Sequence, residues 1–111
     1  MTQIGQFTRL RGLYSGRLRT LTIDVHLVLV PAPTSDHPQQ PDYRIHAGDA
    51  DGPEIGAAYK RVSDKAGEFL ALWLDDPALP APLRASLFQN PYDKKGWNLH
   101  WTRTPKASGL D

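Results

Sequence analysis

Turn-forming residues recur at short intervals along the whole chain, and this spacing constrains the fold more than any other feature. The turn signals fall at residues 11–12, 15–16, 31–41, 48–53, 63–67, 76–82 and 90–96. The runs between them have the length of strands and are rich in Val, Leu, Thr, Tyr and Trp, and none is long enough for a stable helix. The pattern predicts an all-β domain: a single small antiparallel barrel or sandwich of about seven strands with short hairpin turns.

A chain of 111 residues suffices for one domain with one core. We therefore expect a single domain over residues 1–111, with an ordered core at about 4–103, a proline-rich loop at 31–41 and a frayed tail at 104–111. The chain has no cysteine and so offers no disulfide or thiolate. It has neither a segment that reads as a signal peptide nor an apolar run long enough to span a bilayer. These features predict a soluble, cytoplasmic protein.

Three hairpins are expected, and they pair residues 4–10 with 13–21, 54–62 with 68–74, and 83–89 with 97–103. In residues 69–75 both alternating sets of side chains are apolar, which predicts a central strand buried on both faces. In residues 97–103 apolar and polar side chains alternate, which is typical of a half-buried strand. We expect four aromatic side chains in the core: Phe69, Trp73, Trp97 and Trp101.

Residues 17–30 form the longest run with the character of a strand. One straight strand of that length would span about 45 Å at roughly 3.3 Å per residue, which exceeds what a domain of this size covers. The apolar alternation also shifts along the run, because Val28 and Val30 add a second apolar face. A bulge or bend near residues 22–24 would account for both observations.

Two carboxylates, Asp75 and Asp76, stand side by side where an apolar run ends. Adjacent side chains of a strand point to opposite faces, so the pair diverges instead of converging on a shared proton. Pro77 follows and favours an extended Asp76, whose carboxylate can accept bonds from the backbone of the next turn. We interpret the pair as the end of a strand, with metal ligation as the alternative.

The remaining chemistry-bearing residues form no catalytic motif. His26, His46 and His100 fall on the more polar faces of expected strands and would suit zinc if those strands were neighbours; otherwise they are surface polar residues. Residues 48–56 loosely resemble a calcium loop but lack its regular ligand spacing. No nucleophile elbow and no phosphate-cradling loop is present in the sequence. We expect no catalysis, no bound metal and no obligatory cofactor.

Five segments together resemble a known family of small bacterial proteins, the family named domain of unknown function 736. The segments are IGQFTRL, YSGRLRTLTI, DYRIHAG, EIGAAYKRVS and LDDPALPAPLRASLF, and the resemblance extends over about residues 4–103. It implies a one-domain cytoplasmic protein, often encoded near conjugative or integrative mobile genetic elements. It implies no activity and no catalytic residue.

Binding is therefore the function that we expect. A protein–protein interaction is favoured because the net charge is only +1, and sheet edges, the acidic residues 36–54 or the proline tract could dock a partner. The partner would be a host-defence or conjugation component of a mobile element, and a homodimer through an edge strand is an option. The alternative is a small barrel that binds single-stranded nucleic acid on aromatic and basic residues. The candidate binding residues are Tyr14, Arg17, Arg19, Tyr59, Lys60 and Arg61.

Overall fold

Eight antiparallel strands form a closed barrel in the computed structural model, which describes residues 2–33, 40–65, 67–79 and 81–101. The strands are β1 (Thr2–Leu10), β2 (Leu13–Arg19), β3 (Asp24–Pro31), β4 (Tyr43–Ala47), β5 (Glu54–Ser63), β6 (Gly67–Leu74), β7 (Leu83–Asn90) and β8 (Asp93–Trp101). Each strand pairs with the next one in the chain, and β1 pairs with β8 to close the ring. The all-β prediction is confirmed; the architecture is a barrel and has one strand more than expected.

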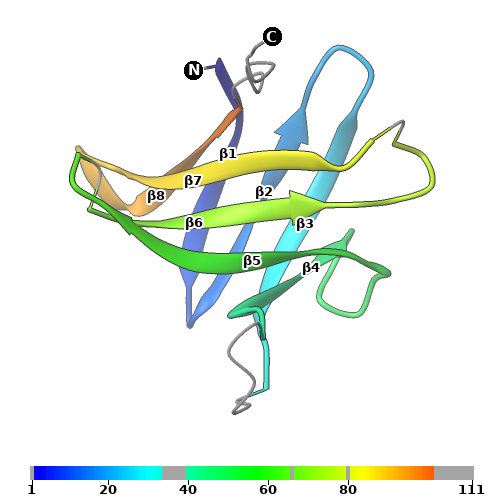
Figure 1. The fold of residues 1–111 in the computed structure, drawn as a ribbon, viewed down its shortest axis with the longest axis horizontal. Helices are drawn as coiled ribbons and strands as arrows, with labels where there is room; N and C mark the ends of the chain where they lie inside the picture. Colours follow the sequence, from blue (N-terminus) through cyan, green and yellow to red (C-terminus); the bar gives the residue numbers. More distant parts are fainter. Residues whose placement is uncertain (1, 34–39, 66, 80, 102–111) are drawn as a thin grey trace, which may run out of the picture.

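The strands of the barrel form two layers that cross (Figure 1). In Figure 1 the strands β5, β6 and β7 lie side by side in front, and β1, β2 and β3 run steeply across behind them. Inward-facing glycines allow neighbouring strands to approach closely where the sheet bends. A Cβ on Gly16 would lie 2.5 Å from Cγ of Phe7, and one on Gly56 would collide with the backbone of Trp73.

The expected bend near residues 22–24 is wrong, because a hairpin turn divides residues 17–30 into β2 and β3. The backbone N–H of Thr20 donates to the carbonyl of Ile23 at 2.7 Å. The N–H of Ile23 in turn donates to Oγ1 of Thr20 at 3.1 Å. These bonds close a turn between the two strands. The sequence does not reveal this turn, because the residues of the segment are typical of one continuous strand.

The three predicted hairpins are confirmed. Arg11 and Gly12 have φ values of 56° and 80°, as the two central residues of a type I′ turn require. The last hairpin is tighter than expected, since β8 begins at Asp93 and not at residue 97. Two side chains hold this turn: Asn90 Oδ1 accepts from the N–H of Tyr92 at 2.8 Å, and Asp93 Oδ1 accepts from the N–H of Lys95 at 3.1 Å.

Alternate residues of every strand fill the barrel with apolar side chains, and no polar or charged residue in the described ranges is buried. The core consists of Phe7, Tyr14, Leu18, Leu27, Leu29, Tyr43, Ile45, Ala58, Leu70, Leu72, Leu74, Ala85, Leu87, Trp97 and Leu99. Trp97 therefore lies in the core as predicted, and Trp101 at the end of β8 is half-buried.

The prediction that Phe69 and Trp73 lie in the core is wrong. The intervening residues Leu70, Leu72 and Leu74 point into the barrel, so strand alternation places Phe69 and Trp73 on its outside, where both are half-buried. The second apolar face of this segment is therefore part of the outer surface of the barrel.

Closure of the ring gives each of the eight strands a neighbour on both sides, so none of them is an edge strand of an open sheet. The described residues include no helix of the length and apolarity that a membrane crossing requires. Most of the proline-rich loop (34–39, with His37) and the expected tail (104–111) lie outside the described residues.

Candidate functional site

The outer surface of β5 to β8 carries aromatic and arginine side chains around two small residues. Tyr59, Ala71, Ser86 and His100 form one row across the four strands, because Tyr59 pairs with Ala71, Ala71 with Ser86, and Ser86 with His100. Larger side chains lie on either side of this row. We call this surface the β5–β8 face, and its members are Tyr59, Arg61, Phe69, Ala71, Trp73, Arg84, Ser86, Phe88 and His100.

The centre of the β5–β8 face is hollow. Ala71 and Ser86 form a low floor, and Tyr59, Trp73 and His100 rise around it. The hollow is open to solvent and has a volume of about 720 Å³. It is large enough to receive a protruding side chain or a planar group.

Two arginines of the β5–β8 face stack on its aromatic rings. The guanidinium carbon of Arg84 lies 4.4 Å from the ring centroid of Trp73, and that of Arg61 lies 5.1 Å from the ring centroid of Tyr59. Among the described residues neither guanidinium forms an ion pair with a carboxylate. Both positive charges remain available to an anionic group.

The remaining rings of the face are packed against one another. Phe69 and Phe88 have ring centroids 5.1 Å apart, and the centroids of Phe88 and His100 are 5.7 Å apart. Nδ1 of His100 is buried and has no hydrogen-bond partner within the described ranges. The packing fixes the rings before any ligand arrives, which lowers the entropic cost of binding.

The structure divides the six predicted binding residues among three locations. Tyr59 and Arg61 belong to the β5–β8 face, whereas Lys60 between them has the inward register and lies at one open end of the barrel. Tyr14 is buried in the core with 3% of its surface exposed, so it does not share an exposed face with Tyr59. Burial, with Tyr43 beside it, raises the pKa of Tyr14 to about 12.

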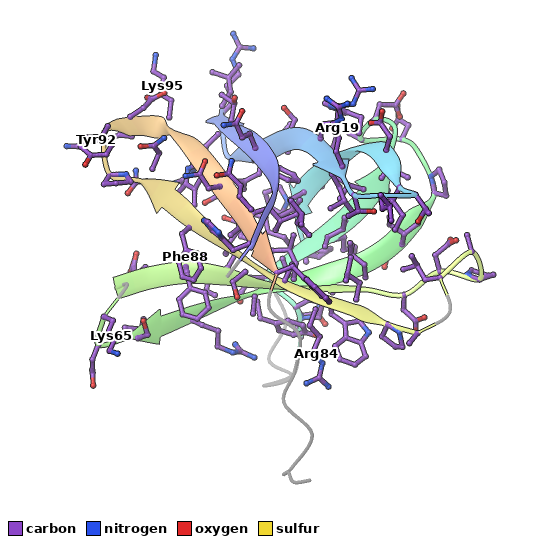
Figure 2. All side chains as sticks on the ribbon, turned by 90° about the horizontal axis from the view of Figure 1, so that it is seen from above. Arg19, Lys65, Arg84, Phe88, Tyr92 and Lys95 are labelled. Atoms are coloured by element: carbon purple, nitrogen blue, oxygen red, sulfur yellow. The ribbon has the colours of Figure 1, made fainter. Side chains whose placement is uncertain are left out.

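Arg17 and Arg19 lie on β2, on the other side of the barrel. Figure 2 shows Arg19 and Arg84 projecting from opposite sides of the molecule. Asp24 on β3 binds the guanidinium of Arg17 through both carboxylate oxygens, with an Nη2–Oδ2 distance of 2.9 Å, and lies 4.0 Å from Arg19. The hydrogen bond to Arg17 lowers the pKa of the Asp24 carboxyl and raises that of Arg17. The charge of this basic pair is partly neutralised within the protein.

Sequence reasoning missed Phe69, Trp73, Arg84, Phe88 and His100 as members of one binding surface. The signal was present in residues 83–88, LRASLF, where Leu83, Ala85 and Leu87 alternate with an arginine, a serine and a phenylalanine. Register against β6 was needed to place those outward residues beside Trp73.

Asp75 and Asp76 end a strand, as predicted. The N–H of Asp75 donates to the carbonyl of Ile55 at 2.8 Å. Oδ2 of Asp76 accepts from the N–H of Ala78 at 2.8 Å, and the carbonyl of Asp76 accepts from the N–H of Leu79 at the same distance. Asp76 thus closes the turn after β6 and Asp75 is exposed.

The three histidines do not converge. His26 and His46 lie on the paired strands β3 and β4, while His100 lies on β8. Nδ1 of His46 is 2.8 Å from the carbonyl oxygen of Gly52. Within the described ranges no group of three His, Asp or Glu side chains could hold a metal.

Carboxylates of the acidic segment make structural bonds. Asp42 Oδ2 accepts from the N–H of Lys60 at 2.8 Å, and Asp49 Oδ1 accepts from the N–H of Asp51 at 2.9 Å. Glu54 lies 3.8 Å from Arg44. The segment that resembles a calcium loop is thus an aspartate-stabilised turn between β4 and β5.

A family model described as "Protein of unknown function (DUF736)" matches residues 3–104 of this chain. The chain belongs to this family. The match extends over the whole barrel, from β1 through β8, and so includes every residue of the β5–β8 face. No curated protein and no solved structure matches the chain.

Proposed function

We propose that this DUF736 protein is a non-enzymatic binding protein of the bacterial cytoplasm, and that its β5–β8 face docks on a protein partner. The observation that carries the proposal is the hollow over Ala71 and Ser86 with its rim of aromatic and arginine side chains. Tyr, Trp and Arg are the residues that contribute most to binding energy at protein interfaces.

The chemistry of the rim defines the partner. Arg61 and Arg84 carry unpaired positive charge beside apolar rings. The matching surface places an apolar side chain in the hollow and one or two carboxylates at its edge, where they can replace the water that now solvates the guanidinium groups. Because the rings are already packed, the face needs little rearrangement to bind.

A partner encoded by, or targeted by, a mobile genetic element is the class that the family resemblance favours. Host-defence and conjugation proteins are the examples that we propose to test first.

The test is a quantitative pull-down with the wild-type protein and two double variants of equal charge change. Arg61→Glu with Arg84→Glu reverses the charge of the β5–β8 face, and Arg17→Glu with Arg19→Glu does so on the far side of the barrel. We expect one stoichiometric partner that the first variant loses and the second retains. Equal retention by both variants would place the contact elsewhere.

Single-stranded nucleic acid is the second candidate ligand, and the stacked arginines favour it. Cations that lie over aromatic rings on the outside of a small barrel suit bases and phosphates together. The packing of Phe69 against Phe88, and the position of Arg84 over Trp73, argue against it because they leave few ring faces free.

Fluorescence anisotropy of labelled single strands at low and moderate salt separates the two candidates. Salt-sensitive binding that Arg61→Glu with Arg84→Glu abolishes would identify nucleic acid as the ligand. No binding at micromolar protein and low salt would leave the protein partner as the ligand of the face.

A further inference from the structure

One open end of the barrel is lined by polar side chains that point inward, and the other end is apolar. The polar end is a cavity of about 360 Å³. Its polar groups are Arg9, Tyr14, Tyr43, Lys60, Arg61, Glu68 and Trp97. The cavity at the opposite end is lined chiefly by Leu, Ile, Val and Ala side chains. The inward positions of the strands thus change from apolar to polar at one end only.

The polar end contains more hydrogen-bond donors than acceptors. Tyr14 and Tyr43 are buried, with 3% and 6% of their surfaces exposed, and their rings meet edge to face with centroids 5.4 Å apart. The guanidinium of Arg9 lies 5.4 Å from the ring centroid of Tyr14, and Lys60 reaches the rim from β5. Of the described residues that line the cavity, Glu68 alone carries a negative charge.

Trp97 adds a donor that the protein itself leaves unused. Trp97 is 7% exposed and thus more than nine-tenths buried. Its indole Nε1 has no hydrogen-bond partner within the described residues. A buried donor without an acceptor costs on the order of 1–3 kcal/mol. A ligand acceptor that reached this N–H would remove that cost.

The bottom of the cavity is apolar. Leu70 is buried beneath the polar groups, and Phe69 and Val62 form part of the wall. The volume is that of a small ligand site, and the mouth of a β-barrel is a common place for one. The cavity thus combines an apolar bottom with the cations of Arg9, Lys60 and Arg61, two tyrosine hydroxyls and the indole N–H of Trp97.

We propose that this end of the barrel binds a small organic anion. The apolar or aromatic body of the anion lies against Leu70, and its carboxylate or phosphate lies among Arg9, Lys60, Tyr14 and Tyr43. The cavity lies at the end of the barrel and the hollow lies on its outer surface, and Arg61 lines both. The cavity site does not depend on the protein partner proposed above.

The test is an NMR titration of the full chain with phenyl phosphate and with benzoate, and with benzyl alcohol as the neutral control. We expect saturable shifts of the Trp97 indole N–H, whose resonance the Trp97→Phe variant identifies. Lys60→Gln or Arg9→Gln should weaken binding on the order of tenfold, as loss of one charge-assisted bond does. Both side chains are exposed, so these variants should fold.

Lys95→Gln, at the tip of the β7–β8 hairpin, and Arg84→Ala, on the β5–β8 face, are the matched controls and should leave the affinity unchanged. Figure 2 shows both residues away from the barrel interior. Three outcomes would overturn the proposal: no saturable shift at millimolar probe, equal shifts with benzyl alcohol, or shifts that Arg84→Ala removes and Lys60→Gln does not.

Discussion

Arg84 lies with its guanidinium carbon 4.4 Å from the centre of the Trp73 indole ring, on the outside of the barrel. The two residues are direct cross-strand partners on β6 and β7. Among the described residues no carboxylate pairs with Arg84. Substitutions of Arg84 therefore test whether the β5–β8 face already has this arrangement in the free protein or takes it only when a ligand binds.

Arg84→Ala should lower the free energy of unfolding by about 0.5–1 kcal/mol, which is the usual worth of an exposed cation–π pair. Arg84→Lys keeps the charge but loses the planar stacking, so its effect should be smaller than that of alanine. Urea unfolding measures both variants, and Arg19→Ala on the opposite side serves as the control. Equal stability of Arg84→Ala and wild type would show that the stack contributes nothing to the free protein.

Asp76→Ala should lower stability by about 0.5–2 kcal/mol, as the loss of a capping-type aspartate does. The reason is the bond from the N–H of Ala78 to Oδ2 of Asp76. Asp75→Ala changes an exposed side chain and should stay within about 0.5 kcal/mol of wild type. Thermal melts compare the two; a larger loss for Asp75 would mean that the roles of the pair are reversed.

Tyr14 should make the protein less stable at high pH. Its pKa is raised from 10 to about 12 by burial, so between these values the unfolded chain releases a proton that the folded chain retains. The free energy of unfolding then falls by up to about 1.4 kcal/mol per pH unit in that range. Tyr14→Phe lacks this contribution, so urea midpoints from pH 9 to 11 should fall less steeply for the variant. Parallel slopes would contradict the burial of the hydroxyl.

Gly16→Ala should destabilise the barrel by about 1–3 kcal/mol, the range for an overpacked core. The added Cβ would lie 2.5 Å from Cγ of Phe7, which is itself buried. Gly96→Ala is the matched control, because its Cβ would meet the Asp93 carboxylate at 3.3 Å and that side chain can move. If the two alanine variants melt at the same temperature, the strands do not approach each other as closely as described.

Sequence patterns predicted the strands better than they predicted the surface. Turn chemistry at residues 11–12 located a hairpin because Gly tolerates the positive φ that such a turn needs. The division between β2 and β3 escaped prediction because Thr20 and Ile23, which close the turn, are typical strand residues. Phe69 and Trp73 were assigned to the core because both alternating faces of residues 69–75 are apolar, which is also the pattern of a strand buried on both faces. The candidate site itself depends on register, which brings Arg84 beside Trp73 and which no local pattern contains.

The pairing of β1 with β8 joins the two ends of the described chain. During synthesis β1 has to wait for the last strand before it gains its second neighbour, and the core lacks Trp97 and Leu99 until then. A nascent chain can therefore form its early hairpins before β8 is available but cannot close the ring until then. The protein should accordingly reach its native state only after β8 has left the exit tunnel, with the open side of β1 exposed to chaperones in the meantime.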